Sequence, residues 1–160
     1  MDKLYLVIPC YNEEEVLHDT SVQLYEKMNA LINAGKISPE SRIVFVNDGS
    51  KDKTWQIIEE LHSQDKIFQG IKLSRNKGHQ NALLAGLMTV KSKCDMTISL
   101  DADLQDDINA IDAMVDKYYE GCDIVYGVRS ARETDTFFKR TTAEGFYKLI
   151  KAMGADITYN

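Results

Sequence analysis

Residues 42–64 read RIVFVNDGSKDKTWQIIEELHSQ, and this stretch decides the fold. The run Arg42–Val46 is rich in β-branched and aromatic residues and is short enough for one buried strand. A polar turn follows, and then Trp55, Ile58 and Leu61 recur at helical spacing. The stretch therefore predicts a strand, a loop and a helix in immediate succession.

The same order recurs along the whole chain. The other predicted strands are Leu4–Ile8, Gly70–Leu73, Met96–Leu100 and Asp123–Tyr126, and the other helices carry Leu17, Leu24, Met28 and Leu31, then Leu83, Leu87 and Val90, then Ile111, Met114, Val115 and Tyr118. Strands that alternate with helices of this length predict a mostly parallel sheet with helices on both faces, connected right-handedly. We therefore expect a Rossmann-like α/β domain.

The composition indicates one folded domain over residues 1–160. Of the 160 residues 44% are hydrophobic, which is enough for a core, and there are only two prolines. No apolar run approaches the roughly 18 residues of a membrane span, and the first residues lack the pattern of a signal peptide. We expect a cytoplasmic location, with Cys10, Cys94 and Cys122 reduced and without function.

The charge is unevenly distributed. A formal net charge of -6 argues against a nucleic-acid partner, because such binding needs many phosphate-neutralising Lys and Arg side chains. Residues 129–151 nevertheless contain six basic and three acidic residues, so this segment carries a charge of +3 within an acidic chain. The segment is a candidate anion site.

Polar residues follow the predicted strands, at the edge of the sheet where open α/β folds bind ligands. The first loop is PCYNEEE from Pro9, whose acids also suit a helix N-terminus. Asp48 ends the second strand, where an acid commonly holds a ribose hydroxyl or a base edge, whereas Asp52 is explained by capping the next helix. The third loop, SRNKGHQN from Ser74, has basic residues and amides suited to phosphate but matches no phosphate-loop fingerprint.

The strongest local signal is SLDADLQDD, residues 99–107. In an extended segment Asp101 and Asp103 point the same way, and Gln105 continues the alternation. Such a D-x-D motif can occur by chance on a solvated turn, but at the carboxyl end of a buried strand it favours Mg²⁺ or Mn²⁺, which accept waters and substrate phosphates as further ligands. No histidine of the chain is predicted to act as a base.

Four motifs taken together, VIPCYNEEE, VNDGSKDKT, LSRNKGHQNALLAG and LDADLQDD, resemble in order and spacing the inverting glycosyltransferases of family 2 with the GT-A fold. Within that family, DADLQ and the tail GVRSAR through Lys139 and Arg140 are similar to the polyprenyl-phosphate glycosyltransferases, the group of dolichol-phosphate mannose synthase. The resemblance implies a GT-A nucleotide-sugar-binding domain. Asp107 departs from it, because relatives usually carry proline there.

The resemblance also assigns roles to residues. It implies that the nucleotide sugar is held by Pro9, Tyr11, Glu13, Asp48, Lys77, Asp101, Ala102 and Asp103, with Lys77 near the diphosphate. It implies Asp101, Asp103 and Gln105 as metal ligands, and Arg129, Arg132 and Arg140 as the site of the acceptor phosphate. Asp101, Asp103 and Arg129 are the expected catalytic residues.

The expected reaction is transfer of a hexose from a nucleotide donor, preferably UDP, to polyprenyl phosphate with inversion. The metal neutralises the charge of the departing nucleoside diphosphate. A phosphate acceptor, with a second pKa of about 6, needs no general base at neutral pH. A saccharide hydroxyl would need one, for which Asp106 or Asp107 is available.

Several alternatives stay open at this point. A nucleotidyltransferase, or a binding module without catalysis, would also use a nucleotide-binding α/β domain. Residues 136–150 are either a packing helix or an interfacial helix that would place the protein at the inner face of the membrane. Relatives usually continue into further helices and membrane spans, so we expect this chain to be part of a longer protein. A homo-oligomer is neither favoured nor excluded.

Overall fold

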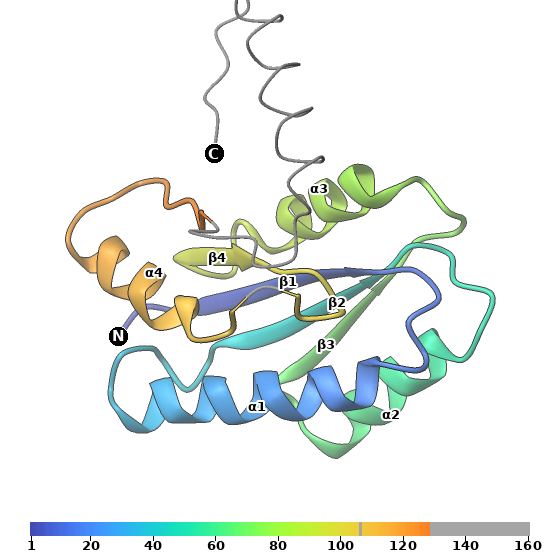
Figure 1. The fold of residues 1–160 in the computed structure, drawn as a ribbon, viewed down its shortest axis with the longest axis horizontal. Coiled ribbons are helices and arrows are strands. Elements are labelled where there is room, and N and C mark those ends of the chain that lie inside the picture. Colours follow the sequence, from blue (N-terminus) through green and yellow to red (C-terminus); the bar gives the residue numbers. More distant parts are fainter. Residues whose placement is uncertain (106, 129–160) are drawn as a thin grey trace, which may run out of the picture. The chain divides into compact units, whose positions relative to one another are not determined.

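The computed structural model describes residues 1–105 and 107–128. By its contacts the chain divides into a unit Met1–Ile124 and a second unit that begins at Val125. The elements of the first unit are β1 (Leu4–Cys10), α1 (Leu17–Asn33), β2 (Arg42–Asn47), α2 (Thr54–Gln64), β3 (Phe68–Lys72), α3 (His79–Val90), β4 (Met96–Ser99) and α4 (Ala110–Tyr119) (Figure 1). Each of the first four predicted strands and each predicted helix is present.

The predicted fifth strand is wrong. The backbone from Cys122 to Val128 is irregular, and the side chains of Ile124 and Tyr126 are 71% and 82% exposed. A β-rich run becomes a strand only when a neighbouring strand satisfies its backbone groups and its side chains are covered. Neither condition holds for this run in the part of the chain that the structure describes.

The sheet is parallel throughout, with the strand order β3-β2-β1-β4. In the register of β1, Val7 lies beside Val44 of β2 and beside Ser99 of β4. The chain therefore steps outward from β1 to β3 and then returns to the far side of β1. Because βαβ crossovers are right-handed, this reversal moves the connecting helix to the opposite face of the sheet.

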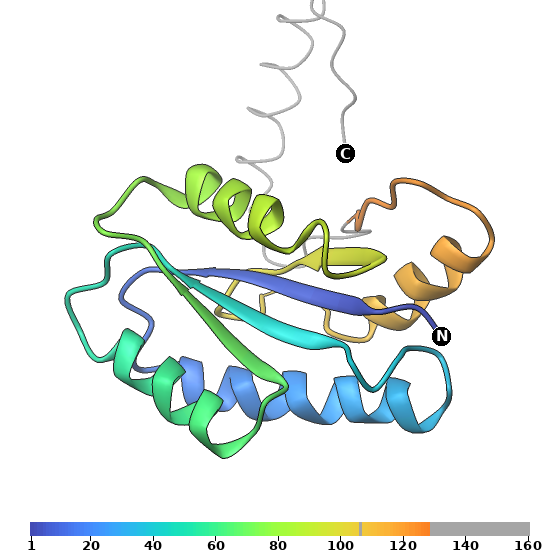
Figure 2. The same ribbon diagram turned by 180° about the vertical axis from the view of Figure 1, so that it is seen from behind.

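Figures 1 and 2 show the result: α1 and α2 cover one face, and α3 covers the other. The reversal also makes the gap between β1 and β4 the topological switch point, where ligands of such sheets bind. None of the helices among residues 1–105 and 107–128 is long and apolar enough to span a bilayer.

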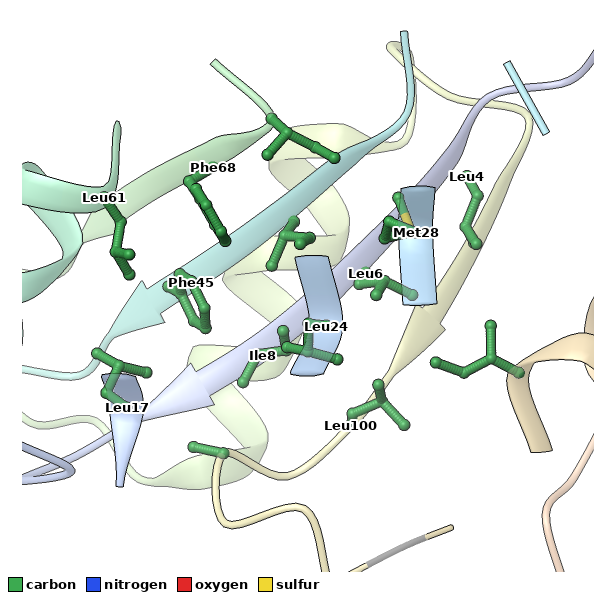
Figure 3. Close-up of a cluster of buried hydrophobic side chains, with 14 of the residues drawn as sticks. Leu4, Leu6, Ile8, Leu17, Leu24, Met28, Phe45, Leu61, Phe68 and Leu100 are labelled. Carbon is green, nitrogen blue, oxygen red and sulfur yellow. The ribbon is translucent and has the colours of Figure 1, made fainter. Parts of the chain in front are cut away.

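The larger hydrophobic cluster lies between the sheet and the helices α1, α2 and α4. Alternate residues of β1, Leu4, Leu6 and Ile8, meet Leu24 and Met28 of α1 there (Figure 3). Phe45 and Phe68 continue the cluster toward β3, with stacked rings whose centroids are 6.3 Å apart. Burial of this apolar surface is the main contribution to the stability of the unit.

The smaller cluster lies under α3 and depends on a close approach of this helix to the sheet. A Cβ atom on Gly86 would lie 2.6 Å from Val7 Cγ1 and 2.7 Å from Val46 Cγ2. The fully buried face of α3 therefore consists of Ala82, Gly86 and Val90, whereas the expected face residues Leu83 and Leu87 are only partly buried. Helical spacing predicted the helix and the buried residue Val90, and Leu83 and Leu87 pack against the cluster, but it did not predict that Ala82 and Gly86 are buried.

Candidate functional site

Three loops meet at the switch point on the carboxyl edge of the sheet. Their residues Pro9, Glu13, His79, Asp101, Ala102 and Asp103 line a pocket of about 340 Å³. Pro9 is near the end of β1 and Glu13 follows it, His79 is the first residue of α3, and the last three follow β4. The order of the strands thus brings together residues as far apart in the sequence as Pro9 and Asp103.

The loop after β4 presents two carboxylates to this pocket from a turn. β4 ends at Ser99, and the Leu104 N–H bonds back to the Asp101 carbonyl at 3.2 Å, with a left-handed φ of 47° at Leu104. The expectation of an extended segment is therefore wrong, but Asp101 and Asp103 are both exposed and both line the pocket. Ala102 between them is 4% exposed.

A hydrogen bond from α1 anchors this turn. The Thr20 hydroxyl donates to the Ala102 carbonyl at 2.6 Å, and both residues are buried. Gln105 does not continue an alternation with the two acids, because its side-chain amide donates to Asp103 Oδ2 at 2.7 Å and lies outside the pocket lining. Thr20 thus fixes the backbone of the turn, and Gln105 orients the carboxylate of Asp103.

The loops after β1 and β2 are joined by reciprocal hydrogen bonds. The Asn12 N–H donates to Ser50 Oγ at 3.0 Å, and the Lys51 N–H donates to Asn12 Oδ1 at 2.9 Å. The Glu14 N–H donates to Asp52 Oδ2 at 3.1 Å, and a further bond runs from the Lys53 N–H to Glu14 Oε2. Satisfied networks of this kind rigidify a loop. The backbone that carries the Glu13 side chain is therefore held in one conformation.

Asp52 binds the first residue of α2, as expected, but it does so from the position before the N-cap residue Lys53. Its Oδ1 accepts the Thr54 N–H at 3.0 Å and the Thr54 hydroxyl at 2.6 Å, where α2 begins.

The loops after β1 and β2 also form a second, polar pocket of about 430 Å³, which is lined by Asn12, Glu13, Glu14, Glu15, Val16, Lys51 and Asp52. Glu13 is the one residue that lines both pockets.

Negative charge is concentrated in the first pocket. Burial raises the pKa of the Glu13 carboxyl above its ordinary value, and repulsion by Asp103, Asp52 and Asp101 raises it further. His79 Nε2 lies 3.6 Å from Asp101 Oδ1, and both side chains are about half exposed. The pocket is therefore suited to a cation or to a ligand that brings one.

Replacing Glu13 by Gln should stabilise the ligand-free protein. At neutral pH the change removes a carboxylate that is partly desolvated and repelled by its neighbours, and we expect a gain of about 0.5 kcal/mol because the pocket is open to solvent. Since the pKa of Glu13 is raised in the folded state, the gain in the free energy of unfolding should be complete above that pKa. It should disappear as the pH falls through that pKa and the carboxylate of the wild type becomes protonated. Urea unfolding at several pH values measures this, and a gain that persists in acid would contradict it.

Divalent metal ions fit the residues of this pocket. Within residues 1–105 and 107–128, no three His, Cys, Asp or Glu side chains converge as a full ligand set. Mg²⁺, however, is usually bound through one or two carboxylates with waters and substrate phosphates as the other ligands. Asp101 and Asp103 provide those two carboxylates, and their charges add to the burial that raises the pKa of Glu13.

The structure brings together some of the expected site residues and separates others. Pro9, Glu13, Asp101, Ala102 and Asp103 share the first pocket, whereas Tyr11 and Lys77 are exposed beside it and Asp48 is buried beneath the neighbouring loop. Arg129, Arg132, Arg140 and the segment 136–150 lie outside the described residues.

Sequence reasoning missed His79. The sequence predicts no histidine as a base, yet His79 at the start of α3 lies next to Asp101 in the fold. Its place directly after Gly78, as the first residue of a helix that follows a strand, was the available signal.

Comparison with known proteins agrees with this architecture. Residues 5–158 match the family model described as "Glycosyl transferase family 2". The chain is 54% identical over 157 residues to "Uncharacterized glycosyltransferase YkoT" of Bacillus subtilis (strain 168), covering 98% of this chain and 47% of the relative. It is 40% identical over 149 residues to "Bactoprenol glucosyl transferase" of Shigella phage SfX, covering 92% and 46%.

Among solved structures, the S. aureus TarS 1-349 crystal structure in complex with UDP superposes with a TM-score of 0.51 at 20% identity. The match covers 86% of this chain and 39% of that one, and it bears on the fold alone. The chain spans about half the length of the curated relatives it matches. Because the family model covers nearly the whole chain, and its fold and motifs agree, this chain belongs to glycosyl transferase family 2.

Proposed function

We propose that the chain forms the donor-binding part of an enzyme that transfers a hexose from UDP to polyprenyl phosphate with inversion, using Mg²⁺ or Mn²⁺ at Asp101 and Asp103. The observation that carries the proposal is the pocket at the switch point, where two carboxylates of one turn face the start of α3. Helix N-termini bind phosphate, and paired carboxylates hold the metals that accompany it. A nucleoside diphosphate with its metal ion would use both the helix N-terminus and the paired carboxylates.

The place of each residue in the pocket suggests its role. Asp101 and Asp103 would hold the metal, and the first turn of α3, with Lys77 before it, would face the diphosphate. When bound, the metal supplies Lewis-acid neutralisation of the charge that develops on the departing diphosphate. Thr20 holds the buried backbone of Ala102, and this bond keeps the two carboxylates in position to bind the metal.

The relatives support the choice of donor and acceptor. Several of them, each about 40% identical to this chain, are named bactoprenol glucosyl transferase, which makes polyprenyl phosphate the first acceptor to test and glucose the first sugar. The structural relative was crystallised with UDP, which makes UDP the first nucleotide. Arg129, Arg132 and Arg140 are the proposed contacts of the acceptor phosphate, which is already anionic at neutral pH and requires no base.

A transfer assay tests the proposal. UDP-glucose, UDP-N-acetylglucosamine and GDP-mannose are each incubated with the protein and Mn²⁺, with undecaprenyl phosphate or a saccharide mixture as acceptor. We expect transfer from a UDP-hexose to the lipid, and NMR of the product should show the anomeric configuration opposite to that of the donor. Transfer to saccharides alone would refute the lipid acceptor, and transfer from GDP-mannose alone would refute the donor.

A further inference from the structure

Helix α3 differs in composition from the other helices that cover the sheet. Of the helices among residues 1–105 and 107–128, only α3, with the sequence HQNALLAGLMTV, contains no Lys, Arg, Asp or Glu. After its first turn the helix is apolar except for Thr89. A helix that is apolar on all sides is normally buried, yet α3 is itself the layer that covers this face of the sheet (Figure 2).

The outer face of α3 is apolar and exposed. Ala82, Gly86 and Val90 face the sheet. Because successive residues of a helix are about 100° apart, Leu84 and Met88 point the opposite way. Their side chains are 56% and 55% exposed. The helix therefore buries small residues against the sheet and presents a leucine and a methionine on its outer side.

Positive charge is concentrated around this helix. Residues 66–94 contain six basic residues and no Asp or Glu, so they carry +6 in a chain whose formal net charge is -6. Two of the six lie apart from the helix, because Lys66 precedes β3 and Lys72 lies 5.0 Å from the ring centroid of Trp55 in α2. The other four lie before and after α3.

These four basic residues frame the apolar face. Arg75 and Lys77 precede α3, Lys91 and Lys93 follow it, and all four are exposed. Lys91 lies three residues after Met88, which places it on the same side of the helix. Residues 74–94, called the α3 surface below, thus combine exposed apolar side chains in the middle with basic side chains at both ends.

We propose that the α3 surface docks on an anionic lipid bilayer, with Leu84 and Met88 in the headgroup layer and the basic side chains on lipid phosphates. Basic residues near an anionic bilayer each strengthen binding, and apolar side chains between them enter the boundary of the acyl chains. A soluble polyanion would use the charges but would leave the apolar side chains in water.

The choice of a membrane rests on the lipid acceptor proposed above. Helix α3 begins at His79, which lines the pocket at the switch point. Docking of the outer face of this helix would therefore hold that pocket close to the bilayer in which a polyprenyl phosphate lies.

Cosedimentation with vesicles tests the proposal without donor or acceptor. The chain is mixed with vesicles of phosphatidylethanolamine and phosphatidylglycerol, or with vesicles of phosphatidylcholine alone. We expect binding to the anionic vesicles only, and a loss of binding at high salt because salt screens exposed charges. Leu84→Gln combined with Met88→Gln should lower the affinity about fivefold, and Lys91→Gln combined with Lys93→Gln about tenfold.

The control variants remove the same kinds of group from the side of α1 and α4. Val22→Gln replaces an exposed apolar residue of α1, and Lys36→Gln combined with Lys117→Gln removes two exposed charges. Both should bind vesicles within about twofold of the wild type, because charges far from the bilayer are screened. Segment 136–150 is unchanged in every variant, so its own contribution cancels in the comparison.

Fluorescence quenching decides which face docks. Leu84→Trp places an indole on the α3 surface, and Val22→Trp places one on α1, each in addition to Trp55. Brominated phosphatidylglycerol should quench the emission of Leu84→Trp more than that of the wild type and leave Val22→Trp like the wild type, since quenching needs contact with lipid. Equal quenching of the two variants would overturn the proposal.

The proposal would also be overturned by a wild type that binds no anionic vesicles, or by binding that neither α3 double variant weakens. A loss in the lysine variant alone, with equal binding of heparin, would assign the surface to a soluble polyanion. A changed oligomeric state or a lower free energy of unfolding in the Leu84 and Met88 variant, with vesicle binding intact, would mean that protein covers this face. Transfer to an acceptor dissolved in detergent needs no membrane, so its failure would refute the proposed function while vesicle binding persists.

Discussion

Asp103→Ala should abolish the metal-dependent part of UDP binding, with a loss of affinity of at least about 100-fold, because even the loss of an outer partner of a metal ligand costs 10- to 100-fold. Asp103 lines the pocket, and its carboxylate is oriented by Gln105 through a 2.7 Å hydrogen bond. Without it, Asp101 would be the one carboxylate of the turn left for the metal. Calorimetric titration of UDP with and without Mn²⁺ measures the effect.

The matched control for this prediction is Asp107→Asn. Asp107 belongs to the same loop, but its Oδ1 accepts the Asn109 N–H at 2.9 Å just before α4 and the residue does not line the pocket. Its replacement removes the same charge from the loop while keeping an acceptor oxygen. An equal loss in both variants would mean that the general charge of the loop, and not metal ligation by Asp103, controls binding.

Phe45→Ala should lower the free energy of unfolding by about 3–5 kcal/mol, the usual cost of removing a buried phenylalanine. Phe45 is fully buried at the centre of the larger cluster, and its ring stacks on Phe68 with an interplanar angle of 16° (Figure 3). Because domains are stable by only about 5–15 kcal/mol, a substantial fraction of the variant should be unfolded under mild denaturing conditions.

Urea denaturation followed by the fluorescence of Trp55, the single tryptophan, measures this change. Val22→Ala is the control, because Val22 is 56% exposed on α1 and its truncation should cost less than about 0.5 kcal/mol. A loss below about 1 kcal/mol in Phe45→Ala would show that the cluster can close around the missing ring, contrary to the tight packing seen here.

Local sequence patterns predicted most of the elements because helix and strand periodicity are properties of a few consecutive residues. Residues 42–64 gave the β2 strand, the polar turn and α2 nearly to their observed ends. The same reasoning failed for Asp123–Tyr126, because a β-rich run needs a neighbouring strand that no local pattern specifies. It also overlooked Ala82 and Gly86, which are buried where α3 approaches the sheet most closely, while Leu83 and Leu87 pack beside them.

For the site, the sequence by itself determined which residue types stand after the strands: the acids after β1 and β4, the glycines of the connecting loops, and the D-x-D motif. Only the tertiary structure decided which of them meet. The strand order places Glu13, His79 and Asp101 around one pocket, and it turns Asp48 toward the amides of another loop. The physical reason is that the order of strands in a sheet is fixed by packing between distant segments, whereas periodicity reports only the conformation of neighbouring residues.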